Sequence, residues 1–218
     1  MKPRPNPWSP PSTPAHGALL AALALTFLTF GCSATAETVD EAERLAEVLE
    51  LEPGMRVADV GAGRGRWSLE IARRIGPTGR LWSTEIDPDD VEDLADRFER
   101  RELPQAKAVL GSITDTGLPD GCCDVVFLRL VYHHFTDPAA MRASLRRALR
   151  PGGRLVIMDI EIQEDWGVLE GVPDRGGHGI AQQQLIDELS KDGFEVVAEH
   201  PDWPGDDDHY LVVFQPCG

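Results

Sequence analysis

Short, continuous apolar runs alternate with segments of helical periodicity from residue 39 to residue 215. Continuous apolar runs are typical of parallel strands that are buried on both faces of a sheet. Apolar residues that recur every three or four positions predict amphipathic helices between these runs. The expected strands span residues 56–60, 80–84, 106–110, 123–128, 154–160, 194–199 and 209–215, and the expected helices begin near Thr38, Arg66, Pro88, Pro138 and Ala181.

Strands and helices alternate from the first strand to the fifth, and this order predicts an α/β fold with a doubly wound parallel sheet. Thr38 and Glu41 form a capping box that predicts the start of the first helix. The stretch Arg-Pro-Gly-Gly at 150–153 predicts a break between the fourth helix and the fifth strand. Residues 37–218 contain neither an internal repeat nor a linker, so we expect them to form one domain.

The first 36 residues have the pattern of an export leader. Lys2, Arg4 and six prolines precede an uncharged apolar run at 18–31, which is shorter than the roughly 20 residues of a membrane-spanning helix. Cleavage before Cys32, which resembles a bacterial lipoprotein site, and cleavage after Ala36 both remain open, as does an uncleaved anchor. Basic residues before the run and acidic ones after it predict an exported domain, periplasmic or membrane-anchored through the leader or a lipidated Cys32. A cytoplasmic location is the alternative.

The net charge argues against a nucleic-acid partner, and the spacing of the possible ligands argues against a metal ion. The 218 residues carry a formal net charge of −16, which would repel a phosphate backbone, so no nucleic acid is expected to bind. The four cysteines form no C-x-x-C motif, and the stretch 200–210, with four acids and two histidines, lacks the ligand spacing of a known metal site. We therefore expect no metal site.

A glycine turn follows the first strand in the stretch VADVGAGRG. The glycines Gly61, Gly63 and Gly65 are spaced G-x-G-x-G, whereas a dinucleotide site has G-x-G-x-x-G and would place its third glycine where Arg66 stands. Asp59 would repel a pyrophosphate and suits a ligand with an ammonium group. The turn therefore predicts a cofactor that is a positively charged nucleoside without phosphates, and it excludes an NAD-dependent oxidoreductase.

A second acidic residue supports a nucleoside ligand. Glu85 ends the second strand, twenty residues after Gly65, where a doubly wound fold places the carboxylate that accepts the ribose hydroxyls. A solvated acid is the alternative for Glu85 taken alone. Ser112 and Arg129 also end predicted strands, and ligands of such sheets bind at this edge.

Four stretches in order resemble the class I S-adenosylmethionine-dependent methyltransferase family: VADVGAGRG, STEID, LPDGCCDVVFLRLVYHHF and LRPGGRLVIMDIE. The resemblance implies a Rossmann-like fold with strand order 3-2-1-4-5-7-6 and strand 7 antiparallel, S-adenosyl-L-methionine as cofactor, and a small-molecule acceptor with an oxygen, nitrogen or carbon nucleophile. It also implies the cofactor-binding residues, which are Asp59, Gly61, Ala62, Gly63, Gly65, Glu85, Ile86, Ser112, Ile113 and Arg129. Among these, Ile86 is expected against the adenine, and Ser112 stands where the family usually has an aspartate.

The loop after the fourth strand supplies the candidates for proton transfer. Tyr132, His133 and His134 are expected over the methyl group, and histidine is a natural base near neutral pH. A structural loop contact is the alternative for either histidine. Candidates of second rank for the acceptor pocket are Asp159, Glu161, His178, Asp208 and His209, and capping of the following helix is the alternative for His178.

Two functions from different classes follow. The first is methyl transfer from S-adenosylmethionine to a small molecule. The second is an exported nucleoside-binding domain that has kept the fold and lost turnover, which the leader makes worth considering because the cofactor is made in the cytoplasm. The intact glycine turn with Asp59 and Glu85 favours the enzyme.

Overall fold

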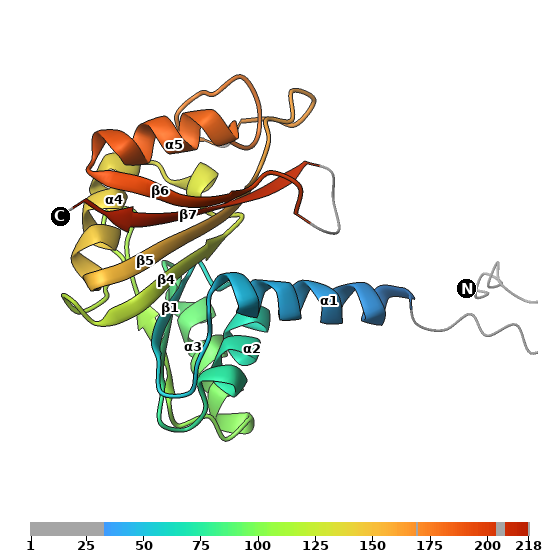
Figure 1. Cartoon of the computed structure of the whole chain (residues 1–218), viewed down its shortest axis with the longest axis vertical. Coiled ribbons are helices and arrows are strands. Elements are labelled where there is room, and N and C mark those ends of the chain that lie inside the picture. The colour runs from blue at the N-terminus through green and yellow to red at the C-terminus, as the bar shows by residue number, and fades with distance from the viewer. Residues whose placement is uncertain (1–32, 169, 204–207, 218) are drawn as a thin grey trace, which may run out of the picture. The chain divides into compact units, whose positions relative to one another are not determined.

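The computed structural model describes residues 33–168, 170–203 and 208–217, with side chains from residue 41 onward. This part of the chain forms a seven-stranded sheet with helices on both faces (Figure 1). The strands are β1 (Arg56–Val60), β2 (Arg80–Glu85), β3 (Ala106–Leu110), β4 (Cys123–Arg129), β5 (Leu149–Ile160), β6 (Phe194–His200) and β7 (His209–Pro216). The helices are α1 (Ser33–Val48), α2 (Arg66–Ile75), α3 (Pro88–Arg100), the 3-10 helix η1 (Tyr132–His134), α4 (Pro138–Ala148) and α5 (Gln182–Lys191).

The strand order is β3-β2-β1-β4-β5-β7-β6. β3, β2, β1, β4 and β5 pair in parallel, whereas β7 runs antiparallel to both β5 and β6. The doubly wound fold, its strand order and the reversed seventh strand are therefore confirmed. The order reverses between β1 and β4, which is the point at which an open α/β sheet binds its ligand.

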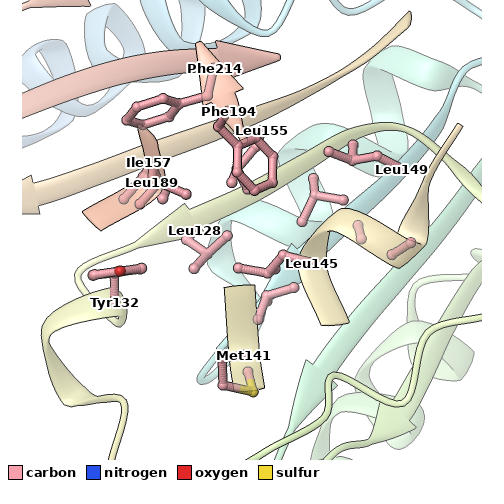
Figure 2. Packing of buried hydrophobic residues seen from close by; sticks show 14 of the residues in the cluster. Leu128, Tyr132, Met141, Leu145, Leu149, Leu155, Ile157, Leu189, Phe194 and Phe214 are labelled. Carbon is pink, nitrogen blue, oxygen red and sulfur yellow. The ribbon is translucent and has the colours of Figure 1, made fainter. Parts of the chain in front are cut away.

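Two apolar layers hold the helices against the sheet. On one face, Leu145 of α4 and Leu189 of α5 pack over β4, β5 and β7, as Figure 2 shows for part of this layer. On the other face, Leu45 of α1 and Ile71 of α2 pack over β1, β4 and β5. Because β4 and β5 are covered from both sides, their side chains are apolar on both faces, which explains the continuous apolar runs.

The two helices that follow β2 and β4 begin at the ligand edge, at Pro88 and Pro138, as the sequence predicts, and each has a capping aspartate. Asp87 accepts a hydrogen bond from the backbone N–H of Asp89, and Pro88 occupies the first turn of α3. Asp137 does the same for the N–H of Ala140 at the start of α4, which also begins with proline. These caps fix where the loops after β2 and β4 end.

Two boundary predictions are wrong. α1 begins at Ser33, five residues before the expected capping box at Thr38, and Glu41 pairs with Arg66 and Arg129 instead of capping the helix. β5 begins at Leu149, because Cys123 pairs with Leu149 and Val125 with Arg154, so the residues 150–153 form a bulge inside the strand rather than a break before it.

Most of the predicted leader lies outside the described residues. Its last four residues, Ser33–Ala36, are described and form the first turn of α1. Cys32 lies outside the described residues. Among the helices in the described part, none has both the length and the apolar character that crossing a membrane requires.

Candidate active site

The glycine turn joins β1 to α2 in a conformation that requires glycine. Gly61, Gly63 and Gly65 have φ values of +70°, +52° and +70°, a region that other L residues rarely adopt. A Cβ on Gly61 would stand 2.5 Å from Val131, and one on Gly65 would stand 2.6 Å from Leu94, whereas a Cβ on Gly63 would have no heavy atom within 4 Å. The turn is therefore closed by protein at its first and third glycines and open at the second.

Glu85 reaches this open glycine from the end of β2. Its carboxylate accepts a hydrogen bond of 2.5 Å from the N–H of Gly63. Burial raises the pKa of Glu85, and the hydrogen bond from Gly63 opposes that rise. The carboxylate is half-buried at the strand end and retains lone pairs for further donors.

A cavity of about 320 Å³ opens at the carboxyl ends of β1, β2, β3 and β4. Gly61, Glu85, Ile86 and Ile113 line one part of it, and His134 lines another. The side chains of Ile86 and Ile113 are 59% and 57% exposed, although isoleucine is normally buried. Two exposed apolar side chains in the wall of a cavity are typical of a binding site for a flat, apolar ring.

Asp59 is buried beneath the turn. Its carboxylate accepts a hydrogen bond of 2.6 Å from the hydroxyl of Ser68, which in turn accepts one of 2.8 Å from Ser83. Burial raises the pKa of Asp59 to about 6, and the negative charge of Glu85 adds to this rise. Asp59 does not line the cavity, so its expected contact with a cofactor ammonium group stays a prediction.

The histidines of η1 point to different partners. Nδ1 of the buried His133 lies 2.5 Å from the carboxylate of Asp159, which also accepts the backbone N–H of His133. Nε2 of His133 lies 3.0 Å from Nε2 of His178. His134 lines the cavity, and partial desolvation lowers its pKa to about 4, with repulsion from the two other histidines adding to the effect.

Tyr132 is a core residue, which corrects its place among the candidates for proton transfer. Its side chain is fully buried, and its hydroxyl donates a hydrogen bond to Glu188 and accepts one from Arg142 (Figure 2 shows the tyrosine in the core). Burial raises the pKa of this hydroxyl, with the charge of Glu188 as a further cause. Tyr132 does not line the cavity, and both hydrogen-bonding partners of its hydroxyl are protein side chains.

Arg129 also turns away from the cavity. Its guanidinium pairs with Glu41 of α1 at 3.2 Å and lies 5.3 Å from the ring centre of Trp67 of α2. Neither Arg129 nor Ala62 lines the cavity. Their expected contacts with the methionine end of the cofactor therefore stay predictions.

The remaining predicted residues divide between the cavity and the surrounding loops. Ser112 lines the cavity, and its hydroxyl accepts the N–H groups of Thr114 and Asp115 within a turn. The carboxylate of Glu161 accepts the backbone N–H of Gln182 at the start of α5. Asp208 and His209 lie beside Glu161 and Ile160 where β7 begins, outside the residues that line the cavity.

Sequence reasoning missed two features of the site. His178 is 45 residues from His133 in the chain, in a segment without clear periodicity, so no local pattern predicts their contact. Leu130 has φ +55°, which is unusual for a residue other than glycine, and it lines the cavity at the end of β4. Strain of this kind is common where a loop is held against a ligand site.

Comparison with known proteins agrees with this geometry. Residues 58–157 match the family model described as "Methyltransferase domain". Over these residues the chain is similar to methyltransferase domains. The cofactor of such a domain is S-adenosylmethionine, whose adenosine has the ribose hydroxyls and the flat apolar ring that suit Glu85, Ile86 and Ile113.

The sequence relatives differ in the activity that their names give, which is C-methylation for one and O-methylation for another. The chain is 28% identical over 158 residues to the ubiquinone/menaquinone biosynthesis C-methyltransferase UbiE of Burkholderia cenocepacia, covering 70% of this chain and 63% of that protein. It is 34% identical over 114 residues to nocamycin O-methyltransferase of Saccharothrix syringae, covering 52% and 41%. It is 31% identical over 150 residues to an uncharacterized 37.1 kDa protein in transposon TN4556 of Streptomyces fradiae, covering 68% and 42%. The chain thus spans less than two thirds of the length of these relatives.

Solved structures share the fold. A SAM dependent methyltransferase from Aquifex aeolicus has a TM-score of 0.67 at 19% identity, covering 79% of this chain and 88% of that one. The [4+2]-cyclase SpnF has a TM-score of 0.66 at 19% identity, covering 84% and 82%. A protein named as a cyclase among the neighbours means that the reaction must be argued from the site and not from the fold.

Proposed function

We propose that this protein transfers a methyl group from S-adenosylmethionine to a small-molecule acceptor. The observation that carries the proposal is a single cavity whose wall joins a nucleoside-type surface, made by Glu85, Ile86 and Ile113, to the histidine His134. A binding domain without turnover would need only the first part. Because the nucleoside-type surface and His134 line the same cavity, transfer of the methyl group to a second bound molecule is favoured.

The cofactor end is built for a nucleoside without phosphates. Glu85 would accept the ribose hydroxyls, and Ile86 and Ile113 would cover the adenine. The open side of Gly63 gives room for close approach of a ligand to the backbone. When bound, the cofactor supplies an electrophilic methyl group on a sulfonium sulfur, so the protein has mainly to position the acceptor and exclude water.

The acceptor end contains the three histidines. His134 lies in the cavity wall, and its lowered pKa keeps its ring neutral at pH 7. Behind it, His178 and His133 lie next to each other, and Asp159 holds His133. Neutral imidazoles at this place can take the proton that an acceptor hydroxyl, thiol or amine loses when it attacks the methyl group.

The test is the formation of S-adenosylhomocysteine from S-adenosylmethionine by the full chain. A panel of small phenols, thiols, amines and activated carbon acids would be supplied one at a time, with Glu85→Ala as the matched inactive control. We expect product from at least one class, and at least tenfold less from the variant when the cofactor is kept below saturation. Cofactor binding without product from any class would favour the binding domain instead.

We also infer that residues 1–36 direct export, and that the lipoprotein-type cleavage before Cys32 is the better of the two sites. Two observations support it: the leader pattern, and a helix α1 that begins at Ser33. Cleavage after Ala36 would remove the first turn of α1, whereas cleavage before Cys32 leaves the helix whole. We expect Cys32→Ala to block processing or to release the protein from membranes in the native host. Intact-mass measurement decides, and an unprocessed chain in the cytosol would overturn export.

A further inference from the structure

Three histidines converge at the acceptor end of the cavity. His133 and His134 come from η1, and His178 comes from the loop before α5. One ring nitrogen from each lies within 4.8 Å of the others. Their rings stack edge to face, with centroid distances of 4.1 Å, 4.6 Å and 5.4 Å. The 3.0 Å contact between Nε2 of His133 and Nε2 of His178 needs a hydrogen or a cation between the two nitrogens.

The contact of Asp159 fixes which nitrogen of His133 faces the group. Asp159 is fully buried and its carboxylate lies against Nδ1 of His133, so that nitrogen carries the proton and donates it. The lone pair of Nε2 then points at Nε2 of His178, 3.0 Å away. A histidine whose second nitrogen is held by a carboxylate is the usual arrangement around a protein-bound metal ion, because the carboxylate orients the ring and makes it a stronger ligand.

We propose that His133, His134 and His178 bind one divalent transition-metal ion, with Asp159 as the carboxylate that orients His133. Three imidazoles suit zinc, iron, nickel or copper rather than magnesium or calcium. In a tetrahedral zinc site the ligand nitrogens are about 3.3 Å apart, given metal–nitrogen distances of about 2.0–2.1 Å. The contact of 3.0 Å between His133 and His178 is already close to that value, and small rotations of the rings would bring in the third ligand.

The position of the group gives the ion a role in the proposed methyl transfer, on which this part of the inference rests. Three protein ligands would leave a fourth position open, as in catalytic zinc sites, and one of the ligands, His134, lines the cavity. A hydroxyl or thiol acceptor bound there would lose its proton to solvent, because the metal lowers its pKa. Its oxygen or sulfur would keep the electron pair that forms the new bond to the methyl carbon, while the pair of the broken carbon–sulfur bond stays on the cofactor sulfur.

A proton shared between His133 and His178 is the competing explanation of their contact. In that case Nε2–H of His178 donates to Nε2 of His133, and the chain of His178, His133 and Asp159 acts as a proton relay without a metal. The two explanations differ in what an added metal does. A relay gains nothing from a metal ion, whereas a three-ligand site binds one ion per chain.

The experiment is titration of the chelator-treated full chain with Zn²⁺ alone by calorimetry, and with Co²⁺ alone by visible absorption. We expect one ion per chain and the intense visible bands of tetrahedral Co²⁺. His134→Ala and His178→Ala should each weaken binding at least tenfold, and Asp159→Asn about 10–100-fold. His200→Ala, which changes a histidine stacked near Trp203 outside the group, should leave the affinity unchanged.

Binding of neither ion, or equal loss of affinity in His200→Ala and His178→Ala, would overturn the metal site. Buried His133 is not needed for the decision, so a folding defect in one variant leaves the test intact. The result is separable from the proposed function. Loss of the metal site with S-adenosylhomocysteine still formed would leave methyl transfer in place with the histidines as direct bases, whereas metal binding without any product would leave the site in place and remove the transferase.

Discussion

Replacing Glu85 with alanine tests the nucleoside-binding wall most sharply. The carboxylate stands at the end of β2, takes the N–H of Gly63 and faces the cavity. Hydrogen bonds to a charged group are worth about 1.5–3 kcal/mol each, and removal of a carboxylate that holds two ribose hydroxyls removes at least one such bond in full. One bond corresponds to a loss of affinity of roughly 10–150-fold, since 1.4 kcal/mol is a factor of ten.

Calorimetric titration of S-adenosylhomocysteine into Glu85→Ala, Glu85→Gln and the parent chain would measure this loss. Glu92→Ala on the exposed side of α3 is the matched control, because it removes one negative charge from the same region without facing the cavity. We expect a loss of at least tenfold for Glu85→Ala, a smaller one for Glu85→Gln, and none for the control. Unchanged affinity in a variant with an unchanged melting temperature would refute the reasoning and make Glu85 a solvated acid.

Three further predictions concern stability and the division of roles. Burial raises the pKa of Asp59 from 3.8 to about 6, so ionising this carboxyl costs the folded state about 3 kcal/mol. The free energy of unfolding should therefore fall as the pH rises from about 4 to about 7. Asp59→Asn should flatten this fall in urea titrations at several pH values, and the same pH dependence in variant and parent would contradict the prediction. Gly61→Ala should destabilise more than Gly63→Ala, since both incur a cost of roughly 1–2 kcal/mol for positive φ but only Gly61 also meets Val131; equal melting temperatures would count against it. Tyr132→Phe should lower the free energy of unfolding by about 1.5–3 kcal/mol, because the hydroxyl pairs with two charged groups, and should leave the rate of methyl transfer within a factor of three; a hundredfold slower reaction would show that Tyr132 takes part in catalysis.

The fold was predictable because local and long-range signals agree. Apolar runs without alternation predict strands covered on both faces, and the sheet has such strands at β4 and β5. The errors arose where tertiary contacts override a local signal. The pair Thr38 and Glu41 predicts a helix cap. In the structure Glu41 forms ion pairs with Arg66 and Arg129, and the helix extends further toward the N-terminus.

The cofactor wall was predictable to the same extent. Glu85 ends β2 and Ile86 follows it, and parallel strands end at one edge, so topology alone brings both residues to the cavity. The burial of Asp59 and the departure of Arg129 toward Trp67 were not predictable, because both depend on which face of the sheet a strand-end side chain takes. Tyr132 and His133 are neighbours in η1, and their side chains leave this short helix in different directions, one to Glu188 and the other to Asp159.

The acceptor end could not be predicted from local sequence. His178 reaches His133 across a segment without periodicity, which only the folded chain brings back to β5 through the bridge between Gln163 and His178. The pair His133-His134 in the sequence indicated the site. His178 and Asp159 were separate candidates of second rank, and only the folded structure shows that both contact His133.

Binding of S-adenosylmethionine tests the central claim most directly. The full chain would be titrated with S-adenosylmethionine, S-adenosylhomocysteine and NAD in separate calorimetric experiments. The cavity with Glu85, Ile86 and Ile113 and the G-x-G-x-G turn predicts one site per chain for either sulfur nucleoside, and at least a hundredfold weaker binding of NAD. NAD affinity equal to that of S-adenosylmethionine, or no binding of either sulfur nucleoside, would contradict the account.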